Sequence, residues 1–423
     1  MLEELIQWLN SYQLHGIKPG LGRITKVLKL LGNPHKKIKT LHIAGTNGKG
    51  STSSILAKVL KEQGFKTGLY TSPHLFRLNE RYQINEKEIE NEDLEECLKI
   101  LKKIIPKDFL ITYFEITTAL AFLYFYEKKV DLAVIECGLG GRLDATNVIK
   151  PEVSIITNIG WDHMHYLGNT LEKIAFEKAG IMKRGVPCVL GNIENSIKHV
   201  FENKAQKLKI PLFWLRKDFT INQEDSKWNY SGTYSFKNLE LSLKGAFQGE
   251  NLACALKALE ILEERGVLKI KEPLLRKALK EVRWLGRYQL FSLKGKEFLI
   301  DVAHNPSGIE TLRENLLKDN FTDFLLIIGV SNEEGDKPFV KMLEILVPLA
   351  SEIFICEFPS PRKVVTIKEW KEALKNFSFN KKISFWENPK KALEEALNRN
   401  YNKILITGSI YFVAKVLPWF FSF

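Results

Sequence analysis

The stretch HIAGTNGKGS, residues 42–51, decides the fold of this 423-residue chain. It lies between a short apolar run, 40–44, and a segment with helical spacing, 51–63. A strand, a glycine-rich turn and a helix start together form a phosphate cradle, because glycines let backbone N–H groups approach a phosphate and the helix N-terminus adds positive potential. We therefore expect Lys49 at the terminal phosphates of a nucleotide and the Ser51 hydroxyl on Mg²⁺. The spacing departs from GxxxxGK[ST] because Gly50 separates these two residues, so the alternative is a glycine-rich turn with an incidental lysine.

Strands alternate with helical patterns on both sides of this stretch. The runs VDLAVIE (130–136) and VSIITN (153–158) have strand character, and helical spacing covers 170–181, 251–264 and 272–282. This alternation predicts α/β layering with a largely parallel sheet. Between 228 and 243 the apolar period becomes 2, which predicts an antiparallel meander.

A second unit is expected after the Trp-Leu-Gly sequence at 284–286. Its expected strands are 297–303, 323–330, 351–357, 382–386 and 403–407, and its expected helices are 308–318, 337–349, 367–376 and 389–399. Strands that alternate with helical crossovers in this way form a small doubly wound domain. The sequence therefore predicts an α/β protein with two domains: a large N-terminal P-loop-containing ATPase-like domain at 1–285 and a smaller C-terminal Rossmann-like domain at 286–423.

Composition and the chain ends exclude several classes of protein. The net charge of +12 suits anionic partners in general, and the five widely spaced cysteines argue against a disulfide framework or a cysteine-rich zinc site. The start, MLEELIQWLN, is acidic and amphipathic, unlike a signal peptide. The apolar stretch 404–423 is interrupted by Thr-Gly-Ser, Lys415 and Pro418, which favours a buried strand and a docking helix over a membrane span. We expect a soluble, cytoplasmic protein.

Three further groups of polar residues follow predicted strands. Glu136 precedes a glycine-rich turn and is either a metal ligand or an ordinary carboxylate at a strand end. His163 and His165 lie in a loop after 153–158, where they either bind metal or phosphate or are structural, and their spacing argues against catalytic zinc. The spacing around Lys178, in AFEKAGI, predicts a solvated face of a helix.

The second unit contains a comparable group in IDVAHNP, residues 300–306. Pro306 can open the next helix, so this is a candidate ligand-facing turn. Asp301 either bonds a ribose hydroxyl or sits at a turn, and Arg287 either contacts phosphate or is exposed.

Taken together, these segments resemble the folylpolyglutamate synthase/dihydrofolate synthase family, within the Mur ligase superfamily. The matching stretches are HIAGTNGKGS (42–51), TSPHLFRLNER (71–81), TYFEITTALAF (112–122), ECGLGGRLDATN (136–147), ITNIGWDH (156–163), IAFEKAGIMK (174–183), GAFQGENLACAL (245–256), GRYQ with IDVAHNP (286–306) and ITGSIYFVA (406–414). The segment SPHL followed by NER separates the folate branch from the cell-wall branch.

The resemblance implies an ATP-dependent ligase that adds L-glutamate to dihydropteroate, to (tetrahydro)folate polyglutamates, or to both, through an acyl phosphate and with release of ADP and phosphate. It implies ATP binding by Asn47, Gly48, Lys49, Gly50, Ser51, Asn251, Arg287 and Asp301. It implies two Mg²⁺ ions held by Ser51, Ser72, Glu136, His163 and a carbamylated Lys178. It implies folate contacts from Lys18, Pro19, Gly20, Leu21, Thr112, Tyr113, Phe114, Glu115, Leu143, Asp144 and Ala145. Lys49, Lys178 and His304 match the residues expected at the reacting groups.

Other activities remain as alternatives at this stage. They are a folylpolyglutamate synthase without the dihydropteroate activity, a related Mur-type amino-acid ligase, and a nucleotide-dependent nucleic-acid binder. The last would explain the basic charge, but no basic tract interleaved with aromatic residues is evident. We expect small-molecule partners only (ATP, L-glutamate, and dihydropteroate or folates), no nucleic acid or membrane, and a monomer.

Overall fold

The computed structural model describes residues 1–332, 335, 338–360, 362–375, 377 and 380–421. The chain divides into two compact units. The first consists of Met1–Gly160, Leu167–Ser242 and Gln248–Arg283, and the second of Trp161–Tyr166, Leu243–Phe247 and Trp284–Phe423. Two short segments that precede the expected boundary near 285 therefore belong to the second unit, which the sequence did not indicate.

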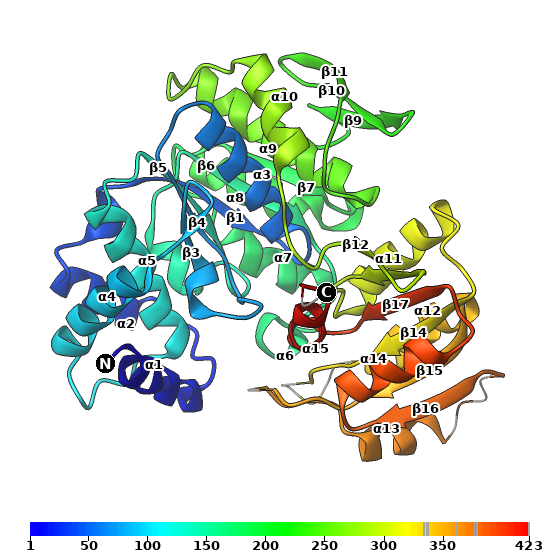
Figure 1. Cartoon of the computed structure of the whole chain (residues 1–423). Helices are drawn as coiled ribbons and strands as arrows, with labels where there is room; N and C mark the ends of the chain where they lie inside the picture. Colours follow the sequence, from blue (N-terminus) through cyan, green and yellow to red (C-terminus); the bar gives the residue numbers. More distant parts are fainter. Residues whose placement is uncertain (333–334, 336–337, 361, 376, 378–379, 422–423) are drawn as a thin grey trace. The chain divides into compact units, whose positions relative to one another are not determined.

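An eight-stranded sheet forms the centre of the first unit, in the order β4-β3-β2-β5-β1-β6-β7-β8 (Figure 1). Six of its strands are parallel: β1 (Lys39–Ala44), β2 (Thr67–Tyr70), β5 (Leu132–Glu136), β6 (Val153–Asn158), β7 (Cys188–Asn192) and β8 (Leu212–Trp214). The strands β3 (Tyr82–Ile84) and β4 (Lys87–Glu88) add an antiparallel edge. The expected α/β fold is confirmed, because β1, β5 and β6 are mostly apolar and almost wholly buried in a parallel sheet.

Helices cover this sheet. They are α1 (Leu2–Ser11), α2 (Gly22–Leu30), α3 (Lys49–Glu62), α4 (Asn91–Ile104), α5 (Tyr113–Glu127), α7 (Leu171–Ala179), α8 (Lys198–Leu208), α9 (Phe247–Glu264) and α10 (Glu272–Glu281). The helix α5 is largely apolar and is buried on all sides from Glu115 to Phe125, so it forms the middle of a core with α1, α2 and α4. The short helix α6 (Met164–Leu167) follows β6.

The expected meander is a three-stranded antiparallel sheet that begins earlier than its sequence pattern suggested. Its strands are β9 (Thr220–Glu224), β10 (Lys227–Ser231) and β11 (Ser235–Leu239). The buried carboxylate of Glu260, on α9, accepts the backbone N–H groups of Thr233 and Tyr234 at 3.1 and 2.8 Å. Lys257 neutralises this carboxylate at 2.9 Å, so a buried ion pair fastens the turn of the meander to α9.

The second unit contains a six-stranded sheet in the order β12-β13-β17-β14-β15-β16. All five expected strands are present: β13 (Lys296–Ile300), β14 (Phe324–Ile328), β15 (Ala350–Cys356), β16 (Lys382–Trp386) and β17 (Lys403–Thr407). The sixth, β12 (Gln289–Leu293), was not expected, because only alternate residues of this antiparallel edge strand are more deeply buried. Its turn to β13 uses Lys294 and Gly295 at positive φ, a pair typical of tight hairpins.

The helices of the second unit are α11 (Pro306–Lys318), α12 (Phe339–Leu346), α13 (Ile367–Leu374), α14 (Pro389–Asn398) and α15 (Ile410–Val416). Residues 337 and 376, the first and last of two expected helices, lie outside the described residues. As expected, the strand β17 is followed by a helix, and Pro306 opens α11 behind the N-cap Asn305. In the described residues, no helix is long and apolar enough to cross a membrane.

The outer face of α3, the helix that begins in the glycine-rich turn, carries a buried lysine held by three carboxylates. Lys58 is 6% exposed, and its Nζ lies 3.2, 3.0 and 3.1 Å from carboxylate oxygens of Glu62, Glu86 and Glu281. Glu86 lies between β3 and β4, and Glu281 ends α10. This lysine therefore joins the N-terminal part of the unit to α10.

Lys58→Met is expected to lower the free energy of unfolding by ~2 kcal/mol, because it leaves three carboxylates together without their shared cation. Loss of one partner from a fully buried pair costs about 3–5 kcal/mol, and Glu86 and Glu281 are partly solvated here. Lys277→Met, which removes an exposed partner of the same Glu62, should cost less than about 1 kcal/mol.

The Lys58→Met deficit should also depend on pH. Hydrogen bonds, first from Lys277 and then from Lys58, hold the pKa of Glu62 below its ordinary value of 4.5. The stability that this lowered pKa provides is present above pH 4.5 and is lost as the pH falls through the lowered value. Urea titrations should therefore show a gap between wild type and variant that narrows below pH 4.5, and a gap independent of pH would contradict this account.

Candidate active site

The glycine-rich turn between β1 and α3 is held in place by the end of β6. The backbone N–H groups of Thr46 and Asn47 both donate to Asn158 Oδ1, at 3.2 and 2.9 Å. Thr157 Oγ1 donates to the carbonyl of Asn47 at 2.6 Å. The N-cap of α3 is Gly48 at φ 81°, and no side chain caps this helix. The first N–H groups of α3 therefore face the turn without a capping side chain, which is how a helix N-terminus binds phosphate.

Two lysines meet at this turn, residues 45–48, which we call the phosphate loop. Lys49 Nζ donates to the carbonyls of Gly45 and Thr46 at 3.0 and 3.1 Å. Lys178 Nζ, from α7, donates to the same Gly45 carbonyl at 2.9 Å. Lys178 is 3% exposed, so the expectation of a solvated helix face is wrong. The packing of α7 against the phosphate loop buries this lysine, and the spacing of apolar residues around it gave no sign of that.

Oxygen donors suited to Mg²⁺ gather at the same edge of the sheet. Ser72 follows β2, Glu136 ends β5 and Ser51 lies in the first turn of α3, which follows β1, and the carboxyl ends of these neighbouring parallel strands lie together. Ser72 donates its backbone N–H to Glu136 Oε2 at 3.3 Å, so these two residues lie together. In the part of the chain that the structure describes, no group of three or more His, Cys, Asp or Glu is arranged to hold a metal. One carboxylate with hydroxyls still fits Mg²⁺, which keeps several waters and uses substrate phosphates as ligands.

Two amide side chains of α9 support the phosphate loop. A Cβ on Gly48 would lie 2.2 Å from Asn251 Oδ1, so only glycine permits this approach. Asn251 Nδ2 donates to Gln248 Oε1 at 2.9 Å, and Gln248 Nε2 donates to Ser51 Oγ at 3.3 Å. The resemblance pointed to Asn251, but the sequence gave no role to Gln248, which touches the predicted Mg²⁺ ligand Ser51.

The three segments expected to contact folate lie together in the first unit. The N–H of Gly20 donates to the carbonyl of Leu143 at 3.4 Å. The ring of Phe114 lies against Gly138, where an added Cβ would be 2.4 Å from the ring. The loop after β5 therefore supports both of the other segments, 18–21 and 112–115.

A buried carboxylate stands between these segments. Glu115 Oε2 accepts the N–H and the hydroxyl of Thr112 at 2.9 and 2.8 Å in a capping box, and accepts Arg23 Nε at 3.0 Å. Glu115 Oε1 is buried and has no hydrogen-bond partner among the described residues. Arg23 was not singled out in the sequence, although it also donates to the carbonyl of Lys18 and so fastens the 18–21 segment. Tyr113 lies under another cation, Arg81, 5.5 Å from the ring centroid.

The Asp144 side chain points into the protein. Its Oδ2 accepts the N–H of Leu139 at 2.7 Å, and its Oδ1 accepts the N–H of Thr146 at 3.0 Å. Burial raises the pKa of this carboxyl group, and these hydrogen bonds oppose the shift. The 143–145 segment, which includes Ala145, can therefore offer a ligand its backbone, whereas the Asp144 carboxylate holds the loop itself.

The second unit brings together the polar residues after β13. Asp301 accepts the N–H groups of Tyr288 and Ala303 at 2.8 and 2.7 Å, and burial raises the pKa of its carboxyl group. The positive charge of neighbouring Arg287 opposes that rise. Asp301 therefore lies directly after β13, and its carboxylate is fixed in orientation by the backbone.

Asp162 connects the other predicted residues of the second unit. Asn305 Nδ2 donates to Asp162 Oδ2 at 3.0 Å, and His304 Nε2 lies 3.7 Å from the same oxygen. His163 Nε2 lies 3.9 Å from Asp162 Oδ2, and His163 has a positive φ of 49°. His304 and His163 are thus both near this carboxylate.

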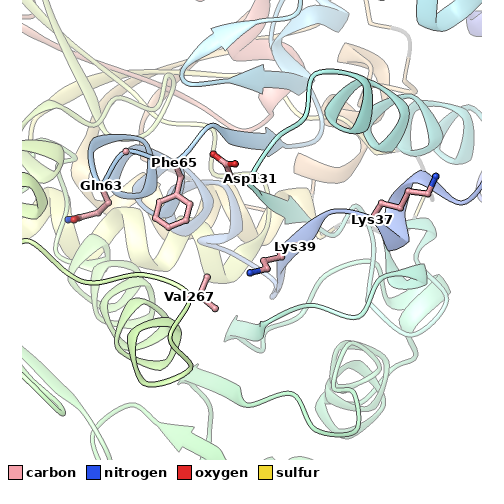
Figure 2. A pocket seen from close by; sticks show the side chains of 7 residues that line it. Lys37, Lys39, Gln63, Phe65, Asp131 and Val267 are labelled. Atoms are coloured by element: carbon pink, nitrogen blue, oxygen red, sulfur yellow. The ribbon is translucent and has the colours of Figure 1, made fainter.

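A separate cavity of about 620 Å³ lies at the amino ends of the central strands of the main sheet, opposite the ends that carry the candidate site (Figure 2). It is lined by Lys37, Lys39, Gln63, Gly64, Phe65, Asp131 and Val267. Lys39 begins β1 and Asp131 directly precedes β5, so this cavity is at the amino ends of the strands whose carboxyl ends carry the phosphate loop and Glu136. It is not part of the candidate active site.

Comparison with known proteins agrees with this arrangement. The Mur ligase middle domain matches residues 43–259, and the dihydrofolate synthetase C-terminal domain matches residues 287–419. The fold and the phosphate loop thus define a Mur-type ligase. The dihydrofolate synthase/folylpolyglutamate synthase of Bacillus subtilis is 35% identical over 424 residues, which cover 97% of this chain and 96% of the relative. The chain belongs to the folylpolyglutamate synthase/dihydrofolate synthase family.

Solved structures agree over the whole length. Folylpolyglutamate synthase from Thermotoga maritima has a TM-score of 0.84 at 36% identity. The match covers 100% of this chain and 97% of the Thermotoga chain. E. coli FolC in complex with DHPP and ADP has a TM-score of 0.88 at 29% identity, with 99% of this chain and 98% of that chain covered. The two-domain α/β expectation is therefore confirmed.

Proposed function

We propose that this protein joins L-glutamate to two kinds of pterin-bearing carboxylic acid, dihydropteroate and tetrahydrofolate polyglutamates, at one ATP site. As a member of its family it is an ATP-dependent carboxylate–amine ligase. The observation that carries the proposal is the phosphate loop, with Lys49 and Lys178 on one carbonyl oxygen, in a chain similar over its whole length to ligases of folates.

Two steps account for the reaction. The substrate carboxylate attacks the γ-phosphorus of ATP, so that ADP leaves and an acyl phosphate forms. The amine of glutamate then attacks the acyl carbon, and phosphate leaves from the tetrahedral intermediate. The first step brings two anions together, so positive charge at the phosphates lowers its barrier. Lys49, at the start of α3, and the uncapped N–H groups of that helix supply such charge.

Mg²⁺, when bound, neutralises phosphate charge and orients the reacting oxygens. Ser51, Ser72, Glu136 and His163 are its proposed ligands, and the pairing of Ser72 with Glu136 supports the first part of this set. A carbamylated Lys178 is the proposed ligand of a second ion. Carbamate formation needs a neutral amine and turns a cation into an anion, so the burial of Lys178 supports this proposal if the proposed metal ion binds beside it.

Glu115 is the proposed anchor for the pterin. A buried carboxylate oxygen without a donor costs free energy unless a ligand supplies one. The aminopyrimidinone edge of a pterin carries adjacent N–H donors that fit this acceptor. The aromatic rings of Phe114 and Tyr113 in the same segment are suited to the ring faces. Lys18–Leu21 and the backbone at 143–145 complete the proposed contacts.

The two acceptor activities are tested with purified enzyme, ATP and Mg²⁺. We expect release of ADP with either dihydropteroate or tetrahydrofolate, in each case only when L-glutamate is present, and we expect products one glutamate heavier by mass spectrometry. Conversion of tetrahydrofolate without any conversion of dihydropteroate would show that the first half of the proposal is wrong and that the enzyme is a folylpolyglutamate synthase only.

Asp301→Ala and Arg287→Ala are expected to weaken ATP use roughly 10- to 150-fold. Both residues are proposed to contact ATP, and a hydrogen bond to a charged group contributes about 1.5–3 kcal/mol. The effect should fall on kcat/KM for ATP in steady-state assays. Arg313→Ala, at a partly exposed site on α11, serves as the control and should behave as wild type. Unchanged ATP kinetics in both variants would remove these two residues from the ATP site.

A further inference from the structure

A buried hydrogen-bonded group joins β1 to the loop that follows β5. His42 Nε2, on β1, lies 2.8 Å from Thr146 Oγ1 and 3.0 Å from Cys137 Sγ. Thr146 Oγ1 lies 2.5 Å from Asp144 Oδ1. All four side chains are buried. Resting on the proposed function, we infer that His42 is a positioning residue for the pterin-bearing substrate, acting through Thr146 and Asp144.

The direction of each hydrogen bond follows from the donors available. The Asp144 carboxylate only accepts, so the single proton of the Thr146 hydroxyl points to Asp144. His42 must then be the donor, through Nε2–H, to Thr146 Oγ1. Burial lowers the pKa of His42 to about 3, so the imidazole is neutral. In this tautomer Nδ1 carries a lone pair, and Nδ1 has no partner among the described residues.

The hydrogen bonds from His42 to Thr146 and from Thr146 to Asp144, which we call the relay, end on the loop after β5, which supports the segments expected to contact folate. Asp144 binds the N–H groups of Leu139 and Thr146 and so fixes both ends of the loop. Between them, the Leu143 carbonyl accepts the N–H of Gly20 from the 18–21 segment. Loss of the His42 donor leaves Thr146 Oγ1 without the N–H that orients it, so the hydroxyl that bonds Asp144 is held less firmly and can turn to Cys137 Sγ, 3.5 Å away.

The phosphate loop is held by different contacts. The Asn47 backbone is bonded to the side chains of Asn158 and Thr157, and the Thr46 hydroxyl accepts the N–H of Gly160, at and beyond the end of β6. None of the bonds of the relay joins these residues. A defect in the relay should therefore affect the pterin-bearing substrate far more than ATP, which distinguishes positioning from a general loss of structure.

Two pairs of variants test this inference. His42→Phe keeps the ring size without a donor, whereas His42→Gln restores an N–H donor, and Thr146→Val and Thr146→Ser form the same contrast. We expect His42→Phe and Thr146→Val each to raise KM for dihydropteroate about tenfold, the worth of one hydrogen bond, with KM for ATP within about twofold of wild type. His42→Gln and Thr146→Ser should be near wild type. The double variant His42→Phe/Thr146→Val should have a KM for dihydropteroate no higher than that of either single variant, because both substitutions break the same relay.

Hydrogen exchange provides a readout that needs no substrate. Amides in the peptide 138–147 should exchange about tenfold faster in His42→Phe and Thr146→Val than in wild type, with peptide 44–50 unchanged. Equal exchange in wild type, His42→Phe and Thr146→Val, or a KM change of the same size for ATP and dihydropteroate, would overturn the inference. If the variants exchange faster than wild type as expected, but wild type does not turn over dihydropteroate, the result would count against the proposed function alone.

Discussion

Replacing Lys178 by alanine is expected to lower kcat for ligation by ~10³-fold or more while leaving the fold and ADP binding largely intact. Removal of one charged group that stabilises a developing charge typically costs a factor of 10²–10³. As a carbamate Lys178 is an anion, so its proposed contribution is to hold a metal ion whose positive charge stabilises the transferring phosphoryl group, and the alanine variant would lose that ion. Lys178→Arg should fail as well, because guanidinium keeps its positive charge and cannot form a carbamate at neutral pH.

Three measurements distinguish this role from simple misfolding. Lys173→Ala, at an exposed lysine on the same helix, should leave kcat unchanged. Formate or acetate should partly restore turnover of Lys178→Ala by standing in for the carbamate. Intact mass in bicarbonate buffer should show added CO₂ on wild type and not on Lys178→Arg. An active Lys178→Arg enzyme with an unmodified wild-type lysine would rule out the carbamate.

Lys49→Met should lower kcat by ~10³-fold, which corresponds to about 4 kcal/mol of lost transition-state stabilisation. Methionine retains the length and apolar stem of the side chain but has no charge. Lys49 holds the Gly45 and Thr46 carbonyls in the structure, and in the reaction it is the cation nearest the start of α3. The loss should appear in kcat more than in KM for ATP if the charge acts mainly on the transferring phosphoryl group.

Lys61→Met is the matched control for Lys49→Met. Lys61 is on the same helix, α3, but binds Glu86 on the outer face. Its replacement should leave kcat within about twofold of wild type in a coupled ADP assay. A Lys49→Met enzyme with more than a tenth of wild-type kcat would mean that this lysine does not stabilise the phosphoryl transfer.

The sequence predicted most of the fold because local signals agreed with the tertiary structure. Glycines at 45 and 48 stand between the strand β1 and the helix α3, and the runs that became β5 and β6 are mostly apolar and buried. The strand β12 was missed because its residues are only partly buried, and an edge strand of this kind has little periodicity.

The candidate site was predicted less completely, for reasons of tertiary packing. The burial of Lys178 depends on how α7 packs against the phosphate loop. Lys178 is 133 residues away in sequence from its partner in that loop, Gly45. Arg23 and Gln248 act through partners 92 and 197 residues distant, which single-sequence spacing does not reveal. The inward direction of the Asp144 carboxylate follows from bonds to Leu139 and Thr146 within its own loop, and only a three-dimensional structure shows it. The assignments of metal and nucleotide ligands stay predictions.

The fate of the substrate carboxylate oxygens tests the central claim most directly, since that claim is transfer of the γ-phosphoryl group of ATP to this carboxylate. Tetrahydrofolate or dihydropteroate labelled with ¹⁸O in the reacting carboxylate is incubated with ATP, Mg²⁺ and L-glutamate, and the released phosphate is analysed by mass spectrometry. An acyl phosphate requires that one labelled oxygen enter inorganic phosphate for each amide bond formed, with ADP unlabelled. Labelled AMP, or amide formation with unlabelled phosphate, would contradict the account.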